Sequence, residues 1–176
     1  AIGAVALAAA VWVIIGLFDR QLLTAFGASE EILPIARDYV LPVKFVVPVF
    51  LFNQMLAAFL RNDRNPILAT RAVLFGGFFN IFGDYFFVFI CDMGAFGAGL
   101  ATAMGSCFTF LLLLTHFHSK QNTLALVRPS RLPKKLWEIT VSGFSSFFLD
   151  VAMGILTVFF NRQIMDWLGS AALSVY

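Results

Sequence analysis

Apolar residues run along this chain in long blocks that are separated by short polar stretches. Five blocks have about the 20 residues that a helix needs to cross a bilayer: residues 1–18, 39–60, 67–90, 94–117 and 136–160. None of them shows the period-two alternation of a strand, and the ten-residue alternating segments of a membrane barrel are absent from the sequence. The pattern predicts an all-α membrane protein that crosses the bilayer about five times.

The polar stretches contain signals for helix ends. Ser29 is a candidate N-cap for a short helix that begins near Glu30. Pro66 is placed to open the next apolar block as a first-turn proline. Gly169 and Ser170 predict a turn after the last block.

Basic residues gather in two of the connections. Residues 61–71 carry three arginines, and residues 119–135, the longest polar stretch, carry five lysines and arginines. Both connections lie on the same side if five helices alternate, whereas the connections on the other side are richer in acidic residues. Cytoplasmic loops of membrane proteins carry an excess of Lys and Arg. We therefore expect both basic connections to be cytoplasmic and residues 119–135 to link two helical bundles.

Composition agrees with a lipid environment. The chain is 60% hydrophobic and 12% charged, with a mean hydropathy of +0.88, whereas soluble domains carry about 25% charged residues. The net charge of +2 gives no reason to expect nucleic acid as a partner. Two cysteines without a CxxC pair or a histidine cluster signal neither a metal site nor a disulfide. Both ends fall within apolar runs, so we expect a fragment whose partners are membrane lipid and the remaining helices of a longer chain.

Three charged side chains fall inside the predicted spans: Lys44, Asp84 and Asp150. A charge at such a position costs about 2.5–3.5 kcal/mol on insertion scales, so each is a functional candidate. Asn80 precedes Asp84 by one helical turn, and Thr102 lies at a similar depth on the next, antiparallel block. A carboxylate, an amide oxygen and a hydroxyl at the same depth are suitable ligands for Na⁺. Alternatively, Asp84 carries a proton and the other two groups are its hydrogen-bonding neighbours. The alternative is a buried polar network that only joins helices.

Lys44 and Asp150 each allow two interpretations. Lys44 is expected either to pair with Asp84 at similar depth or to extend its amine to the outer surface. Asp150 lies near the middle of its block, where it is a candidate second protonation site or a counter-ion for a substrate. The alternative for Asp150 is a hydrogen-bonded carboxyl that burial keeps neutral.

Uncharged polar residues add weaker candidates. Asn53 and Gln54 are expected either to line a cavity or to join helices by hydrogen bonds. His116 and His118 lie at the expected cytoplasmic end, and without a third ligand type nearby we expect both to be solvated.

Small residues and prolines suggest how the helices pack. Gly97, Ala101 and Gly105 recur at four-residue spacing, which favours close packing of helices in lipid. Pro42 and Pro48 lie inside one predicted span, where a kink is tolerated because neighbouring helices satisfy the freed backbone groups.

Several short motifs, in this order and spacing, resemble the third to seventh helices of MATE (multidrug and toxic compound extrusion) transporters. They are GASEE at 27–31, ARDY at 36–39, AFLRND at 58–63, NIFGD at 80–84, GAFGAGLAT at 94–102, GFSSF at 143–147 and FNR at 160–162. The resemblance implies twelve helices in two six-helix lobes. Residues 1–118 would belong to the N-terminal lobe, residues 119–135 would form the cytoplasmic linker between the lobes, and residues 136–176 would begin the C-terminal lobe.

The resemblance also implies an activity and a site. Such a protein would be an antiporter of the inner (plasma) membrane, not an enzyme, that exports small cationic drug-like substrates and uses inward H⁺ or Na⁺ with no cofactor. In bacterial members a first-lobe cation site uses residues that match Asn80, Asp84 and Thr102, together with an Asp of the first helix, which is outside this chain. Asp150 and Asn161 are candidates for a second protonation or substrate site.

The chain departs from the family pattern at three positions. Arg64 stands where the family usually has Gly, Ser145 stands where it usually has Pro, and Lys44 is unusual for the fourth helix. Loss of the proline favours a straighter helix. The main alternative function is a lipid-linked precursor flippase of the same superfamily, for which Lys44 is the one inward basic candidate. An intramembrane aspartyl protease using Asp84 and Asp150 would need sequence contexts that are missing.

Overall fold

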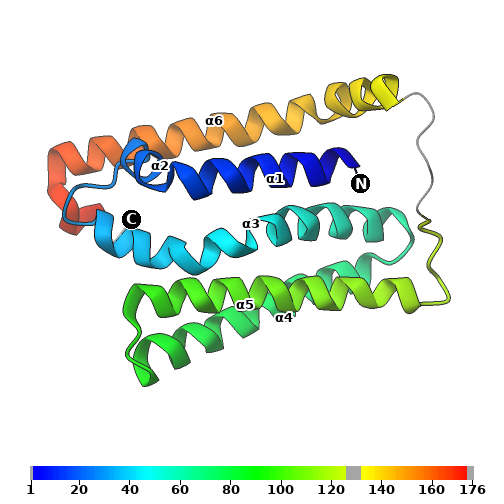
Figure 1. Ribbon diagram of the computed structural model, residues 1–176, viewed down its shortest axis with the longest axis horizontal. Helices are drawn as coiled ribbons and strands as arrows, with labels where there is room; N and C mark the ends of the chain where they lie inside the picture. The colour runs from blue at the N-terminus through cyan, green and yellow to red at the C-terminus, as the bar shows by residue number, and fades with distance from the viewer. Residues whose placement is uncertain (1, 126–131, 174–176) are drawn as a thin grey trace.

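The computed structural model describes residues 2–125 and 132–173, and within these residues every regular element is a helix. Their order is α1 (Ile2–Leu17), α2 (Asp19–Ala25), α3 (Leu33–Asn62), α4 (Pro66–Asp84), α5 (Gly94–Leu114) and α6 (Leu132–Leu173) (Figure 1). A π-helix, Tyr85–Ile90, continues α4, and a 3₁₀-helix, Thr115–His118, continues α5. The all-α prediction is confirmed.

The helices have the dimensions of membrane spans. Four of the described helices are long and apolar enough to cross a bilayer: Leu33–Asn62, Pro66–Ile90, Gly94–His118 and Pro133–Met165. A fifth span is counted if α1 and α2, which meet at an angle of 84°, are taken together. This agrees with the five crossings expected from the sequence.

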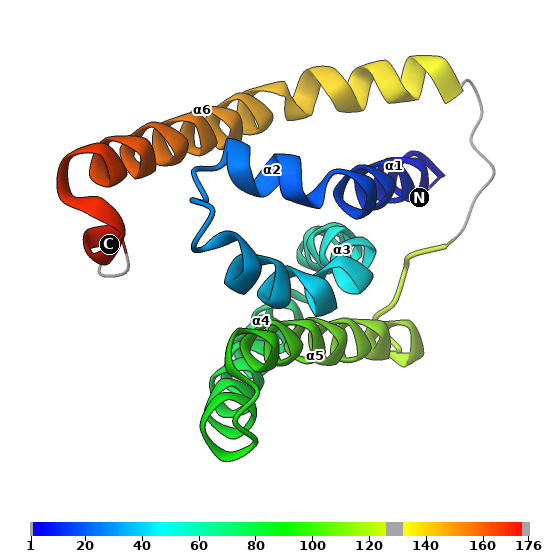
Figure 2. The same ribbon diagram turned by 60° about the vertical axis from the view of Figure 1, so that its left-hand side comes forward.

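Helices α3, α4 and α5 pack into one bundle, and α1 lies against α3 (Figure 2). A cluster of buried apolar side chains fills one end of this bundle: Leu56, Ala57, Leu60, Ala69, Ala72 and Leu113. Helix α6 runs alongside α1 and α2 in both views, and none of its candidate span is buried. The tightly packed part of the described chain is therefore the α3–α5 bundle.

Small residues set the spacing inside the bundle, as the sequence predicted. Gly97, Ala101 and Gly105 are all buried. A Cβ atom added at Gly105 would lie 2.9 Å from the carbonyl oxygen of Gly76, and one added at Gly83 would lie 2.9 Å from the Cβ of Ala101. Helices α4 and α5 thus approach so closely that their backbones are in contact, which leaves no room for larger side chains.

Prolines lie in the first turns of α3 and α4. Pro66 opens α4 as predicted, and the side-chain oxygen of Asn65 accepts a hydrogen bond from the backbone N–H of Leu68 at 3.2 Å. The prediction that a helix begins near Glu30 is wrong. Ser29 accepts a hydrogen bond from the N–H of Ile32 within a turn, and α3 begins only at Leu33. Pro34 explains this start, because a proline fits the first turn of a helix but not its interior.

Arg64 occupies the turn between α3 and α4 with a positive φ of 61°. Only glycine adopts this left-handed conformation without a steric cost from the Cβ atom. The structure thereby gives a physical reason for the glycine that the MATE resemblance implies at this position.

Helix α6 is longer than the predicted block 136–160, because it begins at Leu132 and has 42 residues. The turn predicted at Gly169 and Ser170 is wrong, since both lie within α6. A lone glycine weakens a helix by only about 1 kcal/mol, which neighbouring helical residues offset. The helix continues through Ser145, as expected without the proline.

The expected linker, residues 119–135, is described only in part. Its last four residues, 132–135, are the first turn of α6. Arg128, Pro129 and Arg131 lie outside the described residues. The division of the chain into two lobes at this linker stays a prediction.

Candidate functional site

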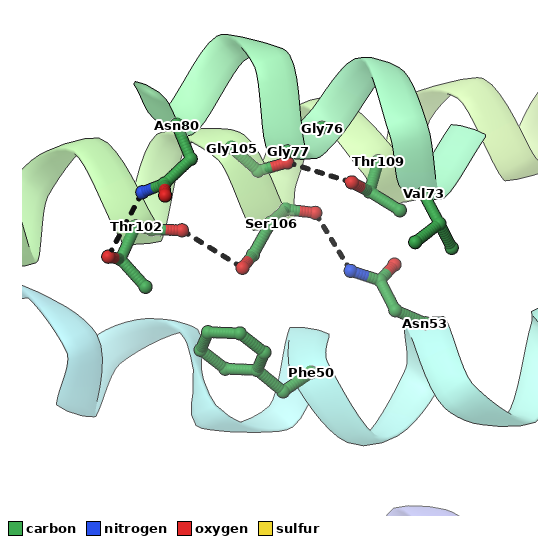
Figure 3. Close-up of a pocket in the computed structure, with 10 residues that line it drawn as sticks. All are labelled: Phe50, Asn53, Val73, Gly76, Gly77, Asn80, Thr102, Gly105, Ser106 and Thr109. Atoms are coloured by element: carbon green, nitrogen blue, oxygen red, sulfur yellow. Dashed lines mark hydrogen bonds between the residues drawn. The ribbon is translucent and has the colours of Figure 1, made fainter. Parts of the chain in front are cut away.

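A cavity of about 220 Å³ lies between α3, α4 and α5 (Figure 3). Its walls are formed by Phe50, Asn53, Val73, Gly76, Gly77, Asn80, Thr102, Gly105, Ser106 and Thr109. Three of these residues, Asn53, Asn80 and Thr102, were candidates from the sequence. Gln54 is exposed and does not line this cavity.

A hydrogen-bonded pair joins α4 to α5 at one end of the cavity. The Asn80 side-chain nitrogen donates to Thr102 Oγ1 at 3.2 Å. The hydroxyl of Tyr39, on α3, lies 3.3 Å from the same Thr102 oxygen. Three helices therefore meet at Thr102. Sequence reasoning missed Tyr39, for which the available signal was the ARDY motif that contains it.

Asn53 connects α3 to the middle of α5. Its side-chain nitrogen donates to the backbone carbonyl of Ser106 at 2.9 Å. The Asn53 side-chain oxygen is buried and has no hydrogen-bond partner in the described part of the chain. Ser106 and Thr109 use their hydroxyls within α5, where each donates to the carbonyl four residues earlier at 2.9 Å. Asn53 thus both joins helices and offers a buried acceptor to the cavity.

Asp84 is the last residue of α4, one turn beyond Asn80, and the π-helix begins directly after it. Its Oδ1 atom is buried and accepts no hydrogen bond from the residues that the structure describes. A buried carboxylate oxygen without a partner is costly. A proton or a hard cation on this oxygen would remove that cost, and oxygen donors of the Asp84, Asn80 and Thr102 types suit such an ion.

Comparisons with known proteins agree on one family. The sequence profile of the MatE family matches residues 1–86. The multidrug export protein MepA of Staphylococcus saprophyticus is 26% identical over 161 residues, which cover 89% of this chain and 35% of that protein. MepA of Staphylococcus aureus is 24% identical and covers 90% of this chain.

One solved structure shares the fold. It is described as the inward-facing conformation of a multidrug resistance MATE family transporter of the MOP superfamily, and it matches 99% of this chain with a TM-score of 0.89 at 23% identity. The chain is thus similar to MATE family transporters in part of its sequence and in its fold. It spans about a third of the length of the curated relatives named above and 40% of the solved chain.

Lys44 does not pair with Asp84, so that sequence-based interpretation is wrong. Its Nζ lies 2.8 Å from Asp19 Oδ2, and the two side chains are only 17% and 12% exposed. Arg37 also approaches Asp19, at 3.5 Å. The sharp bend between α1 and α2 explains the pairing, because Asp19 begins α2 just after the bend. Asp19 thus balances the charge of Lys44, and neither residue lines the cavity between α3, α4 and α5.

The second candidate site of the MATE resemblance lies on α6. Asp150 is exposed, and Asn161 is half-buried near Gly27, where an added Cβ atom would lie 3.9 Å from the Cβ of Asn161. Neither residue lines the cavity between α3, α4 and α5. Their proposed role stays a prediction.

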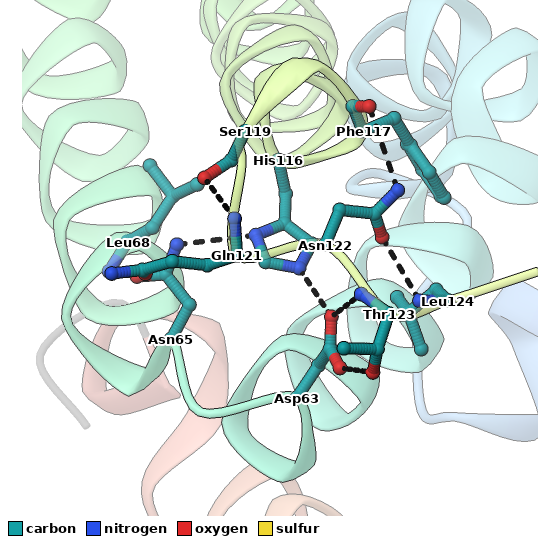
Figure 4. A network of polar contacts seen from close by, with 10 residues as sticks. All are labelled: Asp63, Asn65, Leu68, His116, Phe117, Ser119, Gln121, Asn122, Thr123 and Leu124. Carbon is teal, nitrogen blue, oxygen red and sulfur yellow. Dashed lines mark hydrogen bonds and ion pairs between the residues drawn. The ribbon is translucent and has the colours of Figure 1, made fainter.

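His116 is fully buried, so the expectation that it is solvated is wrong, whereas His118 is exposed as expected. His116 Nε2 lies 2.7 Å from Asp63 Oδ2 (Figure 4). Hydrogen bonds from the Thr123 hydroxyl, from His116 and from the Thr123 backbone N–H lower the pKa of Asp63 to about 2. Sequence reasoning missed this contact because Asp63 and His116 are 53 residues apart.

Proposed function

We propose that this chain is part of a secondary-active multidrug exporter, an antiporter that takes up H⁺ or Na⁺ and exports small cationic drug-like molecules. The names of the relatives, multidrug export protein and multidrug resistance transporter, support the export of drugs. The observation that carries the ion-coupling part of the proposal is the buried, unpartnered Oδ1 of Asp84, in the described part of the chain, one turn from the Asn80–Thr102 hydrogen bond.

The proposed cation site uses the oxygen atoms of three residues. Asp84 supplies the negative charge and accepts either a proton or Na⁺, while Asn80 and Thr102 contribute an amide oxygen and a hydroxyl. The Asn80 nitrogen already donates to Thr102, which leaves the Asn80 oxygen free of hydrogen bonds from the described residues. Tyr39 shares the Thr102 oxygen. Ion binding would then change the contacts of α3, α4 and α5 together, which is what a transporter needs to couple an ion to a change of shape.

The proposed setting is the inner (plasma) membrane, with membrane lipid and the remaining helices of the full-length protein as partners. The basic connections at 61–71 and 119–135 are expected to face the cytoplasm. The hydrogen bonds between Asp63 and Thr123 support a common side, because they join the start of one connection to the other.

The test is transport by the full-length protein in liposomes. We expect Asp84→Asn to reduce drug efflux driven by an imposed H⁺ or Na⁺ gradient to background, because the neutral amide takes up no proton and removes the negative charge that would hold Na⁺. Asp92→Asn, an exposed acid-to-amide change in the turn before α5, is the matched control and should retain efflux. Gradient-driven efflux that survives Asp84→Asn would refute the assignment of Asp84.

The flippase alternative loses its support. Lys44 was the basic residue that favoured an anionic lipid-linked substrate, and its charge is balanced by Asp19 at 2.8 Å. No other observation on the described residues favours this alternative.

A further inference from the structure

Asp63 holds together three separate parts of the chain at one end of the bundle. It follows α3 directly, His116 lies in the 3₁₀-helix after α5, and Thr123 lies in the segment beyond it. Asp63 Oδ2 accepts hydrogen bonds from His116 Nε2 at 2.7 Å and from the Thr123 backbone N–H at 3.0 Å. Asp63 Oδ1 accepts a hydrogen bond from the Thr123 hydroxyl (Figure 4). We call these three residues the linker anchor.

Asn65 and Asp63 together determine where His116 carries its proton. The Asn65 side-chain oxygen accepts from the N–H of Leu68, so its nitrogen is the group that faces His116 Nδ1, at 3.1 Å. An amide nitrogen can only donate, and Nδ1 must therefore be the acceptor. The imidazole proton is then on Nε2, where it is donated to Asp63. Every polar atom of the buried histidine ring is satisfied in this arrangement.

The segment that Asp63 holds also has structure of its own. Ser119 Oγ accepts from the N–H of Gln121 at 3.2 Å, and Asn122 Oδ1 accepts from the N–H of Leu124 at 3.0 Å. Leu124 packs against the buried apolar cluster of the α3–α5 bundle. The segment is thus attached twice, by hydrogen bonds to Asp63 and by the apolar contact of Leu124.

The hydrogen bonds to Asp63 are important because they stabilise a buried charge. Asp63 is 7% exposed, and among the described residues no lysine or arginine lies within ion-pair distance of it. A carboxylate in this position depends on hydrogen bonds from His116 and Thr123. Removing the Thr123 bond therefore leaves the charge less satisfied and weakens the attachment of the segment.

We propose that the linker anchor makes residues 119–124 a fixed part of the α3–α5 bundle, with His116 bearing its proton on Nε2. The first part of the expected inter-lobe linker would then move with the first lobe whenever the two lobes move relative to each other. Only this last consequence rests on the proposed function. The attachment itself is a property of the fold and can be measured without transport.

Amide hydrogen exchange of the full-length protein in lipid nanodiscs tests the attachment. We expect Thr123→Val, which keeps the side-chain shape but removes the hydroxyl, to speed exchange at residues 123 and 124 by about tenfold or more, since hydrogen bonds to charged groups are among the stronger ones. Asp63→Asn should speed it further. Thr140→Val, whose hydroxyl bonds only to its own helix, and Asp92→Asn are the matched controls and should leave residues 123 and 124 unchanged.

Nitrogen NMR of the His116 ring provides an independent measurement. We expect Nε2 to be protonated and Nδ1 to be unprotonated, and this preference to persist in Asn65→Ala, where the Asp63 carboxylate still accepts from Nε2. If Asp63→Asn fails to fold, Thr123→Val and the ring nitrogens decide. Exchange at 123 and 124 that is unchanged in a folded Thr123→Val protein, or a proton on Nδ1, would overturn the proposal. Loss of efflux in Asp84→Asn has no bearing on either result, so the two proposals fail separately.

Discussion

The contact between Gly99 of α5 and the backbone of α3 allows a sharp test of how the bundle is packed. A Cβ atom added at Gly99 would overlap the carbonyl oxygen of Tyr39 and would lie 2.9 Å from the carbonyl carbon of Tyr39 and 2.8 Å from Pro42 Cγ. Neither the Tyr39 backbone nor the proline ring can move aside by changing a rotamer. Gly99→Ala must therefore push α3 and α5 apart.

Two opposing effects set the size of the change. Overpacking a tight contact costs about 1–3 kcal/mol, and a clash with backbone belongs at the upper end of this range. Alanine is a better helix former than glycine by about 1 kcal/mol. We expect a net loss of about 2 kcal/mol in the free energy of unfolding. Because Tyr39 also carries the hydroxyl beside Thr102, the same shift should weaken that hydrogen bond.

Thermal unfolding of the full-length protein in detergent measures this effect. Gly77→Ala is the matched control, because an added Cβ atom at Gly77 meets nothing within 4 Å, so the gain in helix propensity of up to about 1 kcal/mol should appear alone. Gly99→Ala should lower the unfolding temperature, and Gly77→Ala should keep or raise it. If the two variants were equally stable, the close approach of α3 and α5 at Gly99 would be wrong.

Three further predictions follow from charges and backbone conformation. Arg64→Gly should stabilise the protein by up to about 1 kcal/mol, because φ is 61° at this position, and a lower unfolding temperature would contradict this. Lys44→Met should destabilise it by about 1–3 kcal/mol by leaving Asp19 with Arg37 as its one cationic partner among the described residues, and adding Asp19→Asn should restore part of the loss in a double-mutant cycle. The pKa of Asp63 is lowered from 3.8 to about 2, so its ionised form stabilises the fold above pH 3.8. This contribution is lost as the pH falls through about 2. The difference in unfolding temperature between the wild type and Asp63→Asn should therefore shrink between pH 3.8 and about pH 2.

Local patterns in the sequence were enough to predict the helices and part of the site. Only helices and closed barrels satisfy the backbone in lipid, and the blocks lack the alternation of barrel strands, so the all-α fold followed from length, hydropathy and period. Asn80 and Thr102 were placed together because α4 and α5 are consecutive helices joined by a short turn, and depth can then be counted from that turn. The contact was predictable because little chain separates the two residues.

Contacts between distant segments could not be predicted in this way. Tyr39 and Thr102 are 63 residues apart, and Asp63 and His116 are 53 apart. Their meeting depends on how α3 crosses α5, which hydropathy does not specify. Of the two alternatives for Lys44, pairing with Asp84 was wrong, and Asp19 was not considered because the bend that brings it to Lys44 has no proline or glycine signal at residues 17–20. In each case a polar residue had a partner that only three-dimensional packing identifies.

Helix α5 physically joins the two polar clusters of the bundle. Thr102 and His116 lie on the same helical run, 14 residues or about 21 Å apart at 1.5 Å per residue. Between them, Gly105 packs directly on the backbone of α4, and Asn53 bonds α3 to the Ser106 carbonyl. A helix held this closely on two sides cannot bend locally without losing contacts. We therefore expect a shift at the Asn80–Thr102 end to move α5 as a unit, together with the linker anchor at its other end.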